Sequence, residues 1–212
     1  YQPGHTHCDF LSYELAFDDQ MIVVDAGVFE YTEGEMRDYV RSTQAHNTIS
    51  VDGDQQSEIW AAFRVARRAS KLYAQVARNA RGASFKGGYQ GFYAVRGKAK
   101  HLRDVDMQLT EAGNAISRIT IKDVVQFKGK HQAESFIHLH PSLSCQDDGS
   151  GTIGLMQHGE LVANVILARD TSYKISTSYY CPEFGKRIEN PVITMTRTGL
   201  DNIEMGYVIE KL

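Results

Sequence analysis

The chain has 212 residues, of which 42% are hydrophobic and 23% are charged, and its formal net charge is −3. These values are typical of a soluble globular protein with one large domain or two small ones, and they give no electrostatic case for nucleic-acid binding. No apolar stretch approaches the ~20 residues of a membrane-spanning helix, so we expect no membrane span.

Apolar and polar residues alternate with a period of two along most of the chain, which is typical of half-buried β-strands. Residues 11–17 and 21–24 predict a hairpin with an Asp-Asp-Gln turn between them. Further strands are predicted at residues 47–51, 63–66, 71–77, 98–109, 115–121, 133–140, 161–167, 173–179, 192–197 and 203–209. Helical periodicity is absent, and a short helix around residues 55–60 is the best candidate. The sequence therefore predicts an all-β fold, a large antiparallel multi-stranded β-sandwich with very little helix.

Polar side chains with zinc-binding chemistry lie in the first quarter of the chain. His5 and His7 are two residues apart, so on an extended backbone both imidazoles point to the same side. Asp25 ends an apolar run, and His46 precedes the strand predicted at residues 47–51. Catalytic zinc keeps three protein ligands and one open position, so His7, Asp25 and His46 would suffice and leave His5 facing a substrate. Calcium would require more oxygen ligands, and the alternative is that these residues only cap turns.

The segment 37–47 is rich in Arg, Tyr, Gln and Asn, which suits recognition of sugar hydroxyls and carboxylates, although an ordinary solvated loop has the same composition. For a substrate we expect contacts from Tyr31, Arg41 and Asn47. A local basic patch, or alternatively a solvated strand face, is expected from Arg64, Arg67, Arg68, Lys71, Arg78 and Arg81.

The other histidines and the cysteines carry weaker signals. Surface positions are expected for His101, His131 and His158. The pair His138 and His140 has no carboxylate nearby in the sequence, which favours a packing or hydrogen-bonding role. Isolated buried thiols are expected for the cysteines, which are Cys8, Cys145 and Cys181.

Several motifs, in this order, resemble the C-terminal domain of the heparinase II/III-like polysaccharide lyases. They are Gly4-His5-Thr6-His7-Cys8-Asp9 with Leu11-Ser12-Tyr13-Glu14-Leu15, Val24-Asp25-Ala26-Gly27, Tyr39-Val40-Arg41-Ser42-Thr43 with Ala45-His46-Asn47-Thr48, and Val51-Asp52-Gly53 with Gln56-Ser57-Glu58. The resemblance is dense over residues 1–70 and weaker beyond, where His101-Leu102-Arg103 is suggestive.

The resemblance implies that residues 1–212 form the C-terminal β-sandwich of a lyase that cleaves uronic-acid polysaccharides, such as heparin, heparan sulfate, alginate or related exopolysaccharides, by β-elimination. It implies that His5 transfers a proton and that His7, Asp25 and His46 bind one zinc per chain. The family's N-terminal α/α toroid, which supplies the catalytic Tyr and the Asn or His that neutralises the uronate, is missing from this chain. We therefore expect an active carbon–oxygen lyase as the parent protein and an inactive isolated domain, located in the periplasm or secreted by a bacterium.

Two alternatives remain open from the sequence. The first is a non-catalytic carbohydrate-binding or structural module of the same fold. The second is a cupin-like metalloenzyme, which also places a His-x-His pair on a β-barrel. Cupins require a Glu a few residues after the pair, whereas this chain has Leu11 there and Glu14 only further along the strand. The cupin alternative is therefore the weaker of the two.

Overall fold

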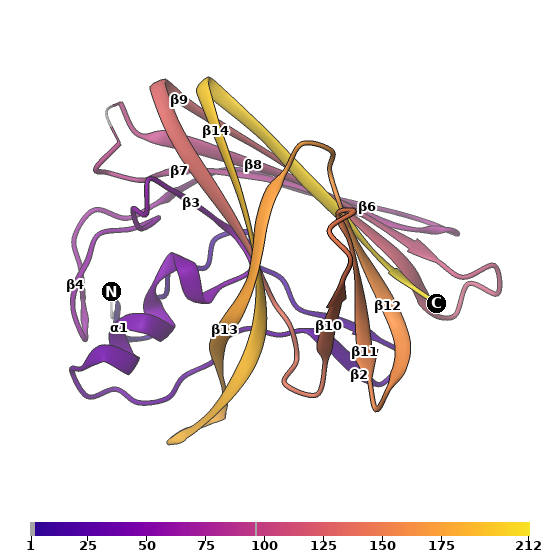
Figure 1. Cartoon of the computed structure of the whole chain (residues 1–212). Coiled ribbons are helices and arrows are strands. Elements are labelled where there is room, and N and C mark those ends of the chain that lie inside the picture. Colours follow the sequence, from indigo (N-terminus) through magenta and orange to yellow (C-terminus); the bar gives the residue numbers. More distant parts are fainter. Residues whose placement is uncertain (1–2, 96) are drawn as a thin grey trace.

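The computed structural model describes residues 3–95 and 97–212 and shows a protein made mostly of strands (Figure 1). In this part of the chain, helical structure is limited to one seven-residue α-helix and two three-residue 3-10 turns. The elements are η1 (Pro3–His5), β1 (Leu15–Phe17), β2 (Gln20–Val23), α1 (Glu35–Arg41), η2 (Thr43–Ala45), β3 (Ile49–Val51), β4 (Ile59–Ala61), β5 (Arg64–Val65), β6 (Ser70–Asn79), β7 (Gly82–Gly91), β8 (Ala99–Leu109), β9 (Ile116–His138), β10 (Ser144–Asp147), β11 (Thr152–Gln157), β12 (Glu160–Leu167), β13 (Ser172–Glu183) and β14 (Lys186–Lys211). This confirms the all-β prediction. The described helices include none that is long and apolar enough to cross a membrane.

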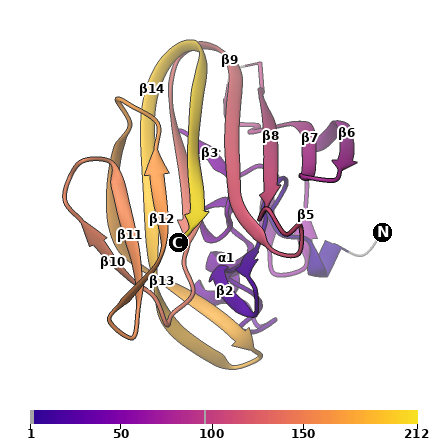
Figure 2. The same ribbon diagram turned by 90° about the vertical axis from the view of Figure 1, so that its right-hand side faces the viewer.

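One antiparallel sheet of ten strands forms the body of the protein. Its main order is β10-β11-β12-β14-β9-β8-β7-β6, while β13 pairs with β14 and β3 pairs with β9. Figure 2 shows β8, β7 and β6 side by side, with β6 as the outermost strand of this edge. Two small hairpins, β1–β2 and β4–β5, lie outside this sheet.

The long strands β9 and β14 belong to both halves of the sandwich. The first half of β9 pairs with β8 and with the end of β14, whereas its second half pairs with β3 and with the start of β14. Between the halves the register shifts, and the backbone φ is 93° at Gly129 and 64° at Asp201. Such a bulge bends the paired strands, so β9 and β14 pass over the top of the molecule in Figure 1. The sequence predicted each of them as two separate strands.

The core lies on the inward faces of these strands. Ile121 and Val125 of β9 are fully buried, whereas Lys122 and Gln126 between and beside them are exposed. Burial of each large aliphatic side chain contributes about 1.5–3 kcal/mol, so this alternation holds the sheet in one register.

Several local predictions were wrong. The segment 55–60 contains bends and the start of β4 rather than a helix, and the α-helix lies at Glu35–Arg41, so it overlaps the segment 37–47 that was expected to be a loop. The first strand starts only at Leu15, since Leu11 has a φ of 62°. Strand β7 was missed because of its four glycines, and β10 and β11 were missed as well.

Candidate functional site

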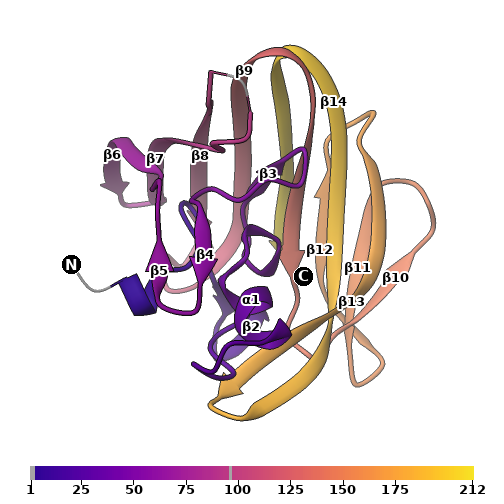
Figure 3. The same cartoon turned by 90° about the vertical axis from the view of Figure 1, so that its left-hand side faces the viewer.

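Two buried arginines of α1 fix the N-terminal segment that carries His5 and His7. Arg41 donates from Nε to the carbonyl of Thr6 at 3.0 Å and from Nη1 to that of Ala62 at 2.7 Å. Arg37 donates to the carbonyls of Gly4 and Ala62. Both arginines thus tie the N-terminal segment to the β4–β5 hairpin, which lies beside α1 in Figure 3. The segment is positioned by tertiary hydrogen bonds rather than by strand pairing.

His5 is exposed at the end of η1 and faces an aromatic neighbour. Its Nδ1 lies 3.2 Å from the hydroxyl of Tyr31, and the two rings meet edge to face. Tyr31 in turn packs on the guanidinium of Arg37, with 5.0 Å from the Arg37 Cζ to the ring centroid. Phe63 and Phe184 flank Tyr31 with exposed fractions of 55% and 67%. The predicted proton-transfer residue is therefore accessible on a surface of aromatic rings.

His7, Asp25 and His46 come together, as the sequence predicted. The rings of His7 and His46 are 5.3 Å apart between centroids, and the Nδ1 of His46 lies 2.6 Å from the Oδ2 of Asp25. The other Asp25 oxygen accepts the backbone N–H of Gly27 at 3.0 Å. Although burial acts to raise it, the pKa of Asp25 is held below its usual range by the hydrogen bond from His46. Burial, together with the nearby His46, lowers the pKa of His7 to about 4, which keeps this imidazole neutral at neutral pH.

His7, Asp25 and His46 have the chemistry of zinc ligands, but their donor atoms are not arranged around one point. His46 is fully buried, and its Nε2 has no hydrogen-bond partner, as expected of a nitrogen that holds a further group. Asp25 orients His46 through Nδ1, the usual role of a carboxylate behind a metal-binding imidazole. No group of three or more His, Cys, Asp and Glu side chains in the described part of the chain is placed to hold a metal ion. The residue types thus fit zinc, while the ligand positions are not assembled.

Two of the three expected substrate-binding residues are buried. Asn47 is fully buried, and its amide nitrogen donates to the carbonyls of Tyr13 and Val24, both at 2.9 Å. Its amide oxygen accepts the backbone N–H of His138 at 2.7 Å. Arg41 is 1% exposed and binds carbonyl oxygens as described above. This burial argues against direct substrate contact by either residue, and of the three only Tyr31 is accessible.

A fully buried charged triad lies behind the site, and the sequence did not predict it. Asp123 accepts hydrogen bonds from His101 at 2.7 Å and from Arg103 at 2.7 and 2.9 Å, and all three side chains are fully buried. The expectation that His101 lies at the surface was therefore wrong. The Nη1 of Arg103 also donates to the backbone carbonyls of Leu11 at 2.7 Å and Asn47 at 2.6 Å. The triad thus braces the two segments that carry His7 and His46.

A signal for this triad was present in the strand alternation. Ala99, His101, Arg103 and Val105 occupy alternate positions of β8, and the first three are fully buried. On β9, Asp123 lies directly opposite Arg103, and Val125 lies opposite His101. Polar residues at inward positions of two neighbouring strands are tolerated only when they pair. Recognising the pair requires the register of β8 against β9, which the sequence does not provide.

Three further histidines, His131, His138 and His158, lie outside the predicted zinc site. His138 is 1% exposed and hydrogen-bonds the carbonyl of Gln44 through Nε2 at 2.9 Å, in line with the expected packing role. Burial lowers its pKa to about 4. His131 is half-buried and pairs with Asp52, whereas His158 is exposed in a turn, as predicted.

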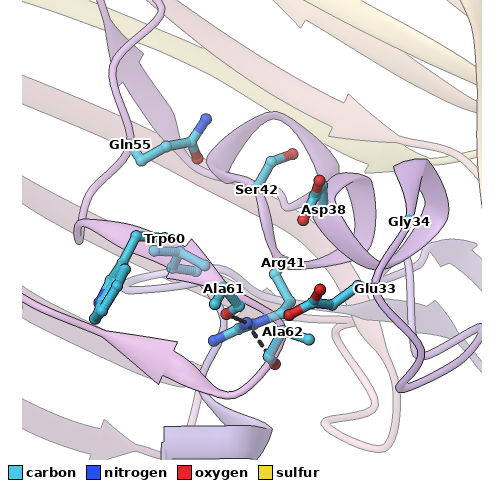
Figure 4. A pocket seen from close by; sticks show the side chains of 10 residues that line it. Glu33, Gly34, Asp38, Arg41, Ser42, Gln55, Trp60, Ala61 and Ala62 are labelled. Carbon is cyan, nitrogen blue, oxygen red and sulfur yellow. Dashed lines mark hydrogen bonds between the residues drawn. The ribbon is translucent and has the colours of Figure 1, made fainter.

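A surface pocket of about 410 Å³ lies between α1 and β4 (Figure 4). It is lined by Glu33, Gly34, Asp38, Arg41, Ser42, Gln55, Ile59, Trp60, Ala61 and Ala62. Of the predicted site residues only Arg41 lines it, and Figure 4 shows that guanidinium turned to the carbonyls of Ala61 and Ala62. The pocket is therefore separate from the histidine cluster.

Comparison with known proteins gives a family and a fold. The family model described as heparinase II/III-like, C-terminal, matches residues 1–202. The chain is similar to the structure of heparan sulfate lyase HepC from Pedobacter heparinus, with a TM-score of 0.77 and 15% identity, covering 98% of this chain and 31% of that chain. A heparinase III gene product matches with a TM-score of 0.72 and 17% identity, covering 98% of this chain and 31% of that chain. A crystal structure of heparinase III matches with a TM-score of 0.67 and 15% identity, covering 98% of this chain and 30% of that chain.

Comparison with curated proteins gave no match. The chain spans about a third of the length of the solved structures to which it is similar. The matches leave the cupin-like alternative without support and agree with the resemblance found in the motifs around His5, Asp25 and His46. The chain belongs to the heparinase II/III-like C-terminal domain family.

Proposed function

We propose that this domain serves a polysaccharide lyase that cleaves uronic-acid polysaccharides by β-elimination, and that His5 transfers a proton in that reaction. The observation that carries the proposal is the exposed His5 imidazole 3.2 Å from the Tyr31 hydroxyl, on a segment held from behind by two buried arginines. The titles of the similar structures name a heparan sulfate lyase and heparinases, which is consistent with this reaction class.

The chemistry requires groups of the type found here. A base removes the proton at C5 of the uronate, the electron pair forms the C4–C5 double bond, and the C4–O4 bond breaks as O4 takes a proton. An imidazole can accept or donate a proton near neutral pH, and it must be accessible to the sugar ring to do so. Tyr31 hydrogen-bonds His5 from the side, so it would fix the orientation of the imidazole. The substrate carboxylate also gains charge in the transition state and requires a neutralising partner.

We further propose that His7, Asp25 and His46 hold one zinc. The support is the unpartnered, buried Nε2 of His46 and the adjacent His7 ring. The Asp25 carboxylate lies on Nδ1, on the other side of the His46 ring, so it would have to turn from Nδ1 to reach the same ion. When bound, zinc would supply positive charge and rigidity next to the His5 segment, since elimination needs no activated water. Before an ion binds, Asp25 fixes the tautomer of His46 by accepting its Nδ1–H, and the pKa of His7, lowered to about 4, keeps that imidazole free to bind a cation.

The rest of the active site is proposed to lie outside this chain. The chain spans 31% of HepC, so the parent would have room for the helical toroid that supplies the Tyr and the carboxylate-neutralising residue. A periplasmic or secreted location in a bacterium goes with this proposal, because a long charged polymer does not cross a membrane unaided.

The test is turnover of the full-length protein and of its His5→Ala variant on one uronic-acid polysaccharide, followed by the absorbance of the unsaturated product. His5→Ala should lower turnover by about 10²–10⁴-fold, the usual contribution of general acid–base catalysis, without changing the melting temperature. The matched control is His158→Ala, which removes an exposed turn histidine and should leave turnover unchanged. Normal turnover by His5→Ala would remove His5 from the reaction.

A further inference from the structure

The charges of this chain are strongly segregated along the sequence. Residues 59–103 contain 11 of the 23 Lys and Arg residues and none of the 26 Asp and Glu residues. The rest of the chain therefore carries 12 cations against 26 anions, although the formal net charge of the whole is only −3. A uniform solvated surface would mix both signs, so this segment needs an explanation of its own.

The structure gathers these cations at one edge of the molecule, on the β4–β5 hairpin, on the outermost strand β6, on the β6–β7 turn and β7, and around the loop that leads into β8. Arg103 belongs to the buried triad, and residue 96 lies outside the described part. The other nine are exposed, and we call them the cationic edge: Arg64, Arg67, Arg68, Lys71, Arg78, Arg81, Lys86, Lys98 and Lys100. Among them Arg67 is paired with Glu58 and Lys86 with Asp104.

Strand β6 presents its cations on one face. Lys71 lies opposite Tyr89 and Arg78 lies opposite Ala83, and these two partners are six residues apart on β7. Residues an even number apart share a face of a strand, so Tyr89 and Ala83 share a face of β7. Lys71 and Arg78 are an odd number of residues apart, but the register shift between Lys71 and Tyr73 adds one residue to β6 and brings both side chains to that same face. All ten residues of β6 are exposed, and a strand of this length spans about 33 Å.

Aromatic rings accompany the cations near the hairpin. The guanidinium of Arg64 lies 5.1 Å from the centroid of the Trp60 ring, which is 61% exposed. Arg67 and Lys98 lie 5.0 and 4.9 Å from the centroid of Tyr93. Cations held on flat rings lose less side-chain freedom when they bind an anion, and exposed rings can pack on sugar rings.

We propose that the cationic edge is a second binding site for an acidic polysaccharide chain. It consists of other residues than the His5 surface and adjoins that surface. This rests on the proposed function, which supplies the polymer. The continuity comes from Phe63, which precedes Arg64 and stacks on Tyr31, the hydrogen-bond partner of His5. A polymer bound at His5 can thus extend along β5 and β6, where its carboxylates or sulfates meet the cations.

A simpler role for charges on an outer strand is to prevent edge-to-edge aggregation. One or two lysines on β6 would suffice for that purpose. It does not account for the cations of the hairpin and of the loop before β8, nor for the absence of every acidic residue over residues 59–103. Binding of a polyanion accounts for both.

The test measures binding of two labelled polymers to this chain, a polyuronate and a sulfated glycosaminoglycan, by fluorescence anisotropy at several salt concentrations, with neutral dextran as a reference. The variant Lys71→Glu/Arg78→Glu/Arg81→Glu should weaken binding of at least one polyanion by tenfold or more at low salt. The neutralised variant Lys71→Gln/Arg78→Gln/Arg81→Gln should lower the dependence of log Kd on log salt by about two to three, because fewer counterions are displaced. Circular dichroism melting checks that each variant is folded.

The matched control is Lys130→Glu/Arg169→Glu/Lys174→Glu, which changes the net charge equally at exposed positions outside the cationic edge. It should change the affinity by less than about threefold. Equal weakening of polymer binding by both triple variants would overturn the proposal, and so would normal binding by Lys71→Glu/Arg78→Glu/Arg81→Glu. The proposal would also fall if that variant bound the polymers normally but no longer associated with the remainder of the parent protein. Turnover of His5→Ala in the full-length protein and polymer binding by the triple variants are separate measurements, so a failure of the proposed catalytic role and a failure of this site are distinguishable.

Discussion

The protein contains two His–Asp pairs of nearly equal length in very different surroundings. His46 lies 2.6 Å from Asp25 near the N-terminal segment, and His101 lies 2.7 Å from Asp123 between β8 and β9. In the second pair Arg103 neutralises the carboxylate, and all the charged groups are fully buried. In the first pair the Nε2 of His46 has no partner, and the Asp25 side chain remains 31% exposed.

The difference separates a structural pair from one that can bind a ligand. A buried polar network stabilises a fold only when every member is satisfied, and the Arg103–Asp123–His101 triad meets that condition. The His46–Asp25 pair keeps an unused nitrogen beside His7, which costs stability unless a further group binds there. The two pairs are linked, because Arg103 also holds the backbone carbonyl of Asn47, next to His46. We call His101–Asp123, with Arg103, the closed pair and His46–Asp25 the open pair. The closed pair therefore supports the open pair.

The largest effect is expected from breaking the closed pair. Asp123→Ala leaves the Arg103 charge buried without its partner and should lower the free energy of unfolding by about 3–5 kcal/mol, a large share of a typical total. Urea unfolding measures the loss. Asp104→Ala is the control: it removes the exposed ion pair to Lys86 one strand position away from Arg103 and should cost less than about 1 kcal/mol. Equal losses in the two variants would contradict the structural role of the triad.

The next effect concerns pH and tests the histidine buried beside the open pair. The pKa of His138 is lowered by burial to about 4 in the folded protein, against about 6.5 in an unfolded chain, so between these values the unfolded state binds more protons. Stability is therefore fully present above about pH 6.5 and falls by about 3 kcal/mol as the pH drops toward 4. His138→Gln keeps a donor for the Gln44 carbonyl and should flatten this part of the pH profile, as measured by urea unfolding. His158→Gln should keep the wild-type profile, and an unchanged slope in His138→Gln would refute the assignment.

A somewhat smaller effect on stability is expected from loss of zinc binding at the open pair. If zinc binds His7, Asp25 and His46, a zinc concentration of 100 times Kd stabilises the folded protein by about 2.7 kcal/mol. His46→Ala should abolish zinc binding, measured by metal analysis, and its melting temperature should no longer respond to zinc or to a chelator. His140→Ala, at a partly exposed histidine, is the control and should retain the response. Zinc content unchanged by His46→Ala would exclude His46 as a ligand.

The smallest effect on stability is expected at His5. This residue is exposed and hydrogen-bonds Tyr31, so His5→Ala should change the free energy of unfolding by less than about 0.5 kcal/mol. Urea unfolding of the variant beside wild type measures it. A loss above about 1 kcal/mol would show that His5 belongs to the scaffold, and the expected contrast with Asp123 would disappear.

The sequence by itself determined the fold class and the residues of the open pair. The period-two alternation is a local property, because successive side chains of a strand point to opposite faces, and it marked β6, β8, β12 and β13. The residue types of His5, His7, Asp25 and His46 predicted that the last three lie together, whereas zinc binding and proton transfer stay predictions. These are features that short stretches of chain carry with them.

Only the tertiary structure decided which polar residues support the site. The helix α1 has no side-chain cap at its N-terminus, so no local signal marked it, and it is held by the hydrogen bonds of Arg37 and Arg41 to other segments. The Arg103–Asp123 pair depends on the register between two strands, which packing of their apolar residues sets. A buried charge is stable only beside its partner, and the partner is chosen by contacts between residues far apart in the chain.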